Sequence, residues 1–314
     1  IISFSMYDCA NSVYSLSITT AIFPIFYENI TSTYNDAGEV ISNKVDIFGH
    51  LVDNTSVYSY TLSFSFLLIA FITPLLSGIA DYVDNKKIFM KFFCYLGSLA
   101  SAALYFFDPE HIYFGLSMVA LASMGFSGSL VFYNAYLPEI AEPKDQDRVS
   151  AKGFSLGYIG SVILLIFNLI LVMFSNELGI TEPGLAPRLC FVSVGIWWAG
   201  FAQITFRRLP DHSFNKVVPD KKYLSKGYQE LRKVFLELTR MKRLPRYLSA
   251  FFVFNMGVQT IMYLAVSFGK DEIKDMPEEG LIISILLIQL IAIGGSYFWA
   301  FVSSKLGNAK ALTS

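Results

Sequence analysis

The chain has 314 residues, of which 54% are hydrophobic and 16% are charged. Soluble domains carry about 25% charged residues, so the composition excludes an ordinary soluble domain and predicts a surface that faces lipid. The formal net charge is −1, and the basic residues separate apolar segments instead of clustering, so nothing indicates a nucleic-acid partner.

Eight apolar segments have the length of about 20 residues that a helix needs to cross a bilayer. In chain order they cover residues 3–27, 56–80, 88–107, 112–137, 153–175, 187–206, 247–269 and 280–303. Nineteen Lys and Arg residues follow the even-numbered spans, and only three lie in the other connections. The positive-inside rule places the basic connections in the cytoplasm. We therefore predict a multi-pass, all-α integral membrane protein.

The first span carries an aspartate. Asn11 and Ser15 share the helix face of Asp8 at i+3 and i+7. A charge inside the hydrocarbon costs roughly 2.5–3.5 kcal/mol by insertion scales. Asp8 is either a carboxylate that binds a proton or solute beside an amide, or a residue near the cytoplasmic surface that is solvated or paired with a loop base.

The turn after the second span and the connection after the fourth form a predicted cytoplasmic gate. Glu139 is expected to pair with Arg148 or Lys152, either as part of the gate or as loop packing. A similar basic turn follows the eighth span, which favours a duplicated six-helix unit. The residues assigned to the gate are Asp81, Asp84, Lys86, Lys87, Glu139 and Arg148.

Polar residues in the fourth and seventh spans are further candidates for a solute path. Asn255, Gln259 and Tyr263 form an i, i+4, i+8 stripe in the seventh span, and three such groups on one face favour a watery cavity over lipid. Asn134 in the fourth span either contacts the solute or makes a hydrogen bond between helices.

The connection 207–246 divides the chain. It holds twelve basic residues, and the apolar spacing within Lys221–Lys242 predicts an amphipathic helix on the cytoplasmic membrane face. We expect a six-helix bundle over 1–206, a basic linker over 207–246 and the first two helices of a second bundle over 247–314. The chain begins within a span and stops just after one, so we interpret it as a fragment of a longer polypeptide.

The turn after the second span resembles the signature of the major facilitator superfamily. The matching residues are Ile79, Ala80, Asp81, Lys86 and Lys87, while Ser77 and Asp84 stand where the signature has glycine. Four segments are similar to the vacuole-effluxer branch, which is related to autophagy-associated amino-acid exporters: Tyr7–Ser12, Tyr133–Ile140, Ser150–Gly160 and Gly257–Thr260. The resemblance implies a major facilitator fold, a central cavity lined by the first, fourth and seventh helices, and transport of a small solute such as an amino acid.

These features predict secondary active transport by alternating access, with a proton as the candidate coupling ion at Asp8 and with no cofactor. No Walker A sequence indicates direct use of ATP. The alternative is a membrane sensor or scaffold that does not transport and that docks a partner on the basic linker. A membrane-embedded enzyme is disfavoured because no histidine lies within a span. The expected location is the cytoplasmic membrane of a bacterium, or the vacuolar or another endomembrane of a eukaryote.

Overall fold

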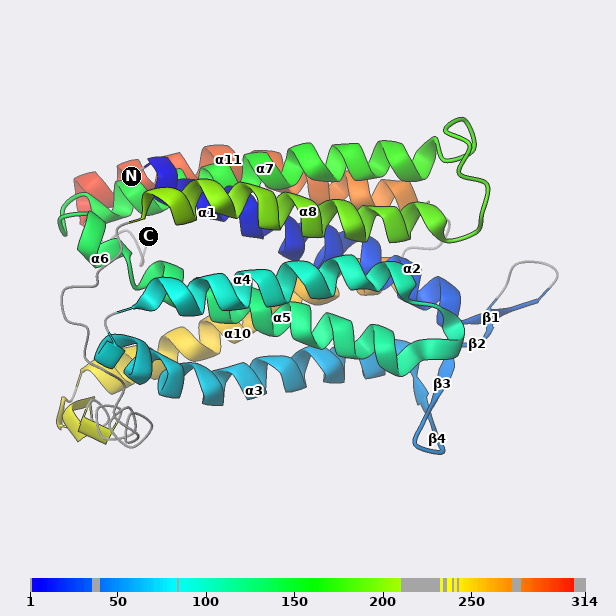
Figure 1. The fold of residues 1–314 in the computed structure, drawn as a ribbon, viewed down its shortest axis with the longest axis horizontal. Helices are drawn as coiled ribbons and strands as arrows, with labels where there is room; N and C mark the ends of the chain where they lie inside the picture. Colours follow the sequence, from blue (N-terminus) through cyan, green and yellow to red (C-terminus); the bar gives the residue numbers. More distant parts are fainter. Residues whose placement is uncertain are drawn as a thin grey trace.

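The computed structural model describes residues 2–35, 40–83, 85–209, 232–233, 236–238, 240–241, 243–272 and 278–307. Seven helices of this part are long and apolar enough to cross a membrane, and the long helices run side by side along the molecule (Figure 1). Four short strands lie at one end. The predicted all-α membrane class is confirmed.

The first span, Ile2–Thr31, consists of three consecutive helical segments. Helix α1 (Ile2–Val13) continues into the π-helix η1 (Tyr14–Ile22) and then into α2 (Phe23–Thr31). Short π segments frequently lie at functional sites. Pro24 stands at the start of α2 and has no amide hydrogen to donate to the preceding turn of the span.

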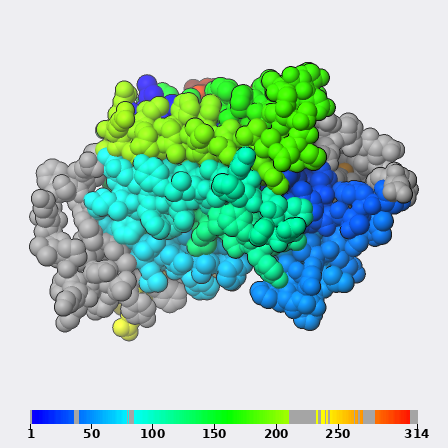
Figure 2. All heavy atoms as spheres, turned by 45° about the vertical axis from the view of Figure 1, so that its right-hand side comes forward, coloured from blue at the N-terminus to red at the C-terminus, as the bar shows by residue number. Residues whose placement is uncertain are grey.

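Five long helices complete the first part of the bundle. They are α3 (Asn54–Val83), α4 (Lys86–Ala103), α5 (Ile112–Asn134), α7 (Gln146–Met173) and α8 (Leu185–Arg208). The first span packs on α7 and α8, and α4 packs on α5 and α8. Figure 2 shows α4 and α8 side by side on one face of the molecule. The short elements between them are η2 (Leu104–Phe106), η3 (Pro109–His111) and α6 (Leu137–Ile140).

The connection between the first two spans contains two antiparallel β-hairpins. Strand β1 (Thr33–Tyr34) pairs with β2 (Val40–Ser42), and β3 (Lys44–Ile47) pairs with β4 (His50–Asp53). Phe48 and Gly49 form the second turn with φ of 54° and 83°, as a type I′ turn requires. These hairpins mark the end of the bundle opposite the basic connections (Figure 1), which we call the outer end.

Two helices follow the basic linker. Helix α10 (Leu244–Glu272) contacts η1 and α2, and α11 (Glu278–Leu306) packs along α7. The predicted span 280–303 lies within α11 and is one of the seven apolar helices. The predicted span 247–269 lies within α10, some of whose side chains are outside the described set, and α10 is not among the seven. Most of the predicted amphipathic helix Lys221–Lys242 is also outside the described residues.

Glycine determines how closely α4 and α5 approach. A Cβ added to Gly125 of α5 would lie 2.5 Å from the Cα of Gly97 and 2.7 Å from the carbonyl oxygen of Phe93, both in α4. Backbone atoms of a membrane helix cannot move aside as a flexible side chain can. The two helices therefore pack backbone to backbone at this point, as small residues allow in membrane proteins.

We expect Gly125→Ala to destabilise the protein by about 1–3 kcal/mol, because the added methyl group forces α4 and α5 apart. The matched control is Gly200→Ala in α8, since an added Cβ there meets no atom within 4 Å. Thermal unfolding of the detergent-solubilised protein measures both. Equal melting temperatures for the two variants would contradict the close contact at Gly125.

Candidate functional site

Asp8 is buried among three membrane spans. It is 8% exposed, and the hydroxyl of Tyr133 in α5 donates a hydrogen bond to its Oδ2 at 2.7 Å. Gly153 of α7 lies against the same carboxylate, and a Cβ at this glycine would overlap Oδ2. Helix α7 therefore covers Asp8 only because residue 153 has no side chain.

Two further glycines extend this contact along α7. Gly157 faces the Ser12 side chain, and Gly160 faces Cys9. On another side of the span, the Trp197 indole of α8 donates to the backbone oxygen of Cys9 at 3.0 Å. The inner half of the first span is thus enclosed by protein, as a helix that carries a carboxylate requires.

Aromatic packing holds the Tyr133 hydroxyl in place. Its ring stacks on Phe4, with centroids 4.1 Å apart and planes 14° apart, and lies 5.1 Å from the Tyr7 ring. A side chain fixed by two neighbours keeps its hydroxyl directed at the carboxylate, so the hydrogen bond to Asp8 is preorganised.

Asn11 has an amide group that the described residues do not satisfy. It is 1% exposed, and its amide nitrogen has no hydrogen-bond partner. Its Oδ1 is 3.5 Å from the Ser12 hydroxyl, which is a long contact for a hydrogen bond. A buried donor without an acceptor costs about 1–3 kcal/mol. A water molecule or a solute oxygen beside Asn11 would recover this free energy.

The predicted gate residues take partners other than those expected. Glu139 was expected to pair with Arg148 or Lys152, but its carboxylate lies 2.7 Å from the Lys86 ammonium. The short helix α6 carries Glu139 to the first turn of α4. Arg148 lies at the exposed start of α7, where the Asp145 carboxylate is 3.0 Å away.

Other predicted gate residues have different outcomes. Lys87 is buried and donates to the carbonyl oxygen of Leu209 at 2.9 Å, which ties α4 to the end of α8. Asp84 lies outside the described residues. Asp81 belongs to α3, but its side chain is outside the described set.

The polar stripe of the seventh span lines a cavity of about 480 Å³. Asn255 and Gln259 of α10 face it, with Ser59 and Ser63 of α3 on the opposite wall. All of its lining residues come from these two helices. The side chain of Tyr263 lies outside the described set.

The candidate residues therefore lie in separate places. Asp8 lies against Tyr133 of α5 and Gly153 of α7, and Asn11 is buried one turn further along α1. Asn255 and Gln259 face α3. Asn134 is exposed at the end of α5. The pocket that Asn255 and Gln259 line lies between the second and seventh spans, and the single cavity lined by the first, fourth and seventh spans stays a prediction from the resemblance.

Sequence reasoning missed Tyr133 as a site residue, because no local pattern relates it to an aspartate 125 residues away. Ser59 and Ser63 were also missed. Their i, i+4 spacing in the second span is a polar stripe of the kind used for Asn255 and Gln259, and it could have indicated the opposite wall of the cavity.

Comparison with known proteins identifies a family and several relatives. Residues 1–313 match the family described as vacuole effluxer Atg22 like. The uncharacterized MFS-type transporter YxiO of Bacillus subtilis is 30% identical over 291 residues, which cover 92% of this chain and 64% of that protein.

Two fungal relatives are more distant. Autophagy-related protein 22-1 of Penicillium rubens is 22% identical over 86% of this chain and 56% of its own length. Autophagy-related protein 22 of Yarrowia lipolytica is 23% identical over 78% and 54%. The chain spans between about half and two thirds of the length of these three relatives. Because the family match extends over nearly the whole sequence, the chain belongs to the vacuole effluxer Atg22-like family.

Proposed function

We propose that this protein is part of a secondary active transporter that moves a small solute across a membrane by alternating access. The observation that carries the proposal is Asp8, an ionisable group buried inside a membrane span with one positioned hydrogen-bond donor. Ionisable residues in such places are expensive and belong to solute paths or proton relays by default. The family, and the transporter name of the bacterial relative, support the same function.

The contact between α7 and α11 is where the two halves would move against each other. We infer that 1–206 forms one half and that 247–314 begins the other, joined by the linker 207–246. The hydroxyls of Ser155 and Ser296 are 2.7 Å apart within this contact. At its cytoplasmic end, the Ser303 hydroxyl donates to the Asp147 carboxylate at 3.0 Å. Breaking the second contact would open the cytoplasmic end.

The chemistry of Asp8 supports the proposal of proton coupling. An ionised carboxylate only accepts hydrogen bonds, and it suits the donor at Tyr133. A protonated carboxyl also has a hydroxyl to donate, so it can bind a different partner. Protonation or deprotonation of Asp8 would therefore change which hydrogen-bonding group the site can bind. Amino acids are the first solutes to screen, because they are the class that the family resemblance implies.

Transport in liposomes tests this role of Asp8. We expect the complete polypeptide, reconstituted with a pH-sensitive dye inside, to show solute-dependent proton movement that Asp8→Asn abolishes. Tyr133→Phe removes the one donor and is expected to reduce the rate about tenfold, as a lost charge-assisted hydrogen bond of about 1.4 kcal/mol would.

The matched control is Tyr58→Phe, which removes a buried hydroxyl that donates to the Thr19 carbonyl at 2.9 Å. This variant is expected to keep proton-coupled transport. Solute movement without protons would reject the coupling at Asp8. Folded protein that moves no solute from any pool would favour a sensor or scaffold.

A charge reversal tests the Lys86–Glu139 pair. The two side chains are 22% and 29% exposed, so we expect a coupling of about 0.2–1 kcal/mol that weakens with salt. Lys86→Glu and Glu139→Lys should each lower the melting temperature, and the double reversal should restore part of it. Strictly additive losses would show that the pair contributes nothing.

A further inference from the structure

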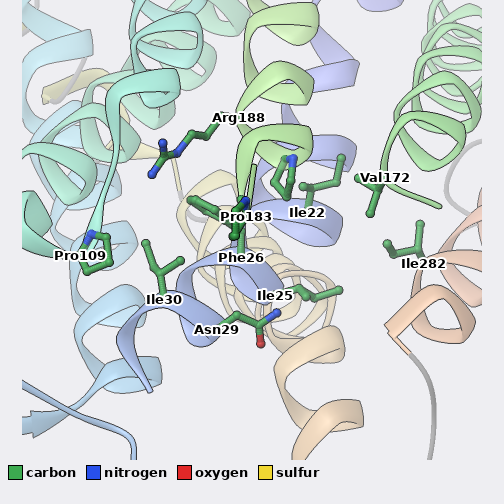
Figure 3. Close-up of a pocket in the computed structure, with 12 residues that line it drawn as sticks. Ile22, Ile25, Phe26, Asn29, Ile30, Pro109, Val172, Pro183, Arg188 and Ile282 are labelled. Atoms are coloured by element: carbon green, nitrogen blue, oxygen red, sulfur yellow. The ribbon is translucent and has the colours of Figure 1, made fainter. Parts of the chain in front are cut away.

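A second pocket, at the outer end of the bundle, is lined by one cation, one amide (Asn29) and otherwise apolar residues. Its volume is about 460 Å³, within the usual range of small-molecule sites. The first span contributes Ile22, Ile25 and Phe26, while Val172 of α7 and Ile282 of α11 also contribute. Arg188, in the first turn of α8, is the one charged residue among the lining residues (Figure 3).

Arg188 lacks an acceptor within the described residues. Its Nε is buried and has no hydrogen-bond partner. Glu177 and Glu182 of the preceding connection could have paired with it, but both are exposed and neither forms an ion pair with it. Because this Nε is closed to solvent, an anion in the pocket reaches the terminal guanidinium nitrogens, which also have no partner among the described residues. A guanidinium without an internal acceptor is available to pair with such an anion.

The geometry indicates the shape of the anion. A guanidinium presents N–H groups in a planar fork that matches a carboxylate. Figure 3 shows Ile22, Ile25, Val172 and Ile282 gathered on one side of the pocket and Arg188 on another. A molecule with a carboxylate at one end and an aliphatic tail at the other satisfies both parts.

The lining residues also favour a simple carboxylate over the carboxylate of a zwitterion. Among the residues that line the pocket, none carries a carboxylate for an ammonium group. The Asn29 side-chain oxygen accepts a hydrogen bond from Tyr34 at 3.3 Å. A simple aliphatic monocarboxylate therefore fits better than the zwitterion of the same tail.

A lipid is a less suitable occupant. Anionic headgroups enrich the cytoplasmic leaflet, whereas Arg188 lies at the opposite end of the bundle. The wall also combines the six-helix part with Ile282 of α11, so an occupant contacts both proposed halves of the carrier. We propose that this pocket is an outer binding site for a small, water-soluble aliphatic monocarboxylate, held by Arg188 through its carboxylate. The assignment of this site to a transport path rests on the proposed function.

Binding to the purified complete polypeptide tests the proposal. The probe is radiolabelled 4-methylpentanoate, measured by equilibrium binding in detergent, with 4-methylpentanamide, leucine, acetate and dodecanoate as competitors. Arg188→Gln is expected to weaken binding about 10- to 100-fold, the loss of one charged hydrogen-bonded contact. Arg208→Gln, an exposed arginine at the other end of the same helix, is the matched control and should bind as the wild type does.

The competitors test separately the charge of the ligand, the length of its aliphatic tail, and whether the site prefers a soluble acid or a lipid. The amide and leucine should compete more weakly than 4-methylpentanoate, and acetate more weakly still. Ile282→Ala should weaken the binding of 4-methylpentanoate and leave the binding of acetate unchanged. If Arg188→Gln binds 4-methylpentanoate as tightly as the wild type does, in protein with an unchanged melting temperature, the proposal is overturned. A strong preference for dodecanoate would also overturn it, because that preference indicates a lipid site.

The liposome assay keeps the two proposals distinguishable. If binding depends on Arg188 but the protein transports no solute, the binding site is supported and the proposed transport function is rejected. Transport of solutes by a wild type that binds no monocarboxylate would reject the pocket and keep the carrier.

Discussion

The packing of the first span against α7 is the contact on which the rest of the structure depends. A helix that carries Asp8 and Asn11 cannot face lipid without a large cost. Accordingly, 89% of the apolar window of this span is buried inside the protein, against 22% for α3 and for α11. The glycines at 153, 157 and 160 allow the approach, because each lies against a side-chain atom of α1 that a Cβ would strike. The other helices then enclose the remaining sides of the span.

The same helix α7 connects the buried carboxylate to the proposed second half. One of its faces presents Gly153 to Asp8, and another presents Ser155 to Ser296 of α11. A displacement of α7 at either contact must be accommodated at the other, because close-packed helices have little free volume between them. The carboxylate and the contact between halves therefore share one rigid element, a physical arrangement through which proton binding could bias the position of α11.

Hydropathy and the placement of basic residues predicted the spans well, because lipid imposes a length and a charge rule on every crossing. The two hairpins, β1–β2 and β3–β4, could not be predicted in this way, because short strands in a polar connection contain no long apolar run. Pairings across the chain were also beyond reach: Glu139 binds Lys86 because α6 turns it toward α4. The stripe of Ser59 and Ser63 is visible in the sequence but is weak evidence for a cavity, because a serine hydroxyl can bond to its own helix, as Ser59 does to the Thr55 carbonyl at 2.9 Å.

Unsatisfied polar atoms suggest where a solute would complete the structure. Half of the buried side-chain polar atoms without a partner, within the part of the chain described, belong to the first span: those of Tyr7, Asn11, Tyr14, Ser17, Thr19 and Tyr27. Some charges outside the first span have internal partners, as the Lys86–Glu139 pair shows. The pocket at Arg188 contacts the outer end of this span, and Asn11 lies in its inner half. The π-helix η1 lies between the two, and its wider turns hold three of the six unsatisfied groups. Some of these groups face polar atoms of neighbouring helices, as Tyr7 faces Ser129 of α5 and Tyr14 faces Ser123 of α5. Asn11 has no such neighbour among the described residues, so on the first span it is the group that a bound water or solute would complete.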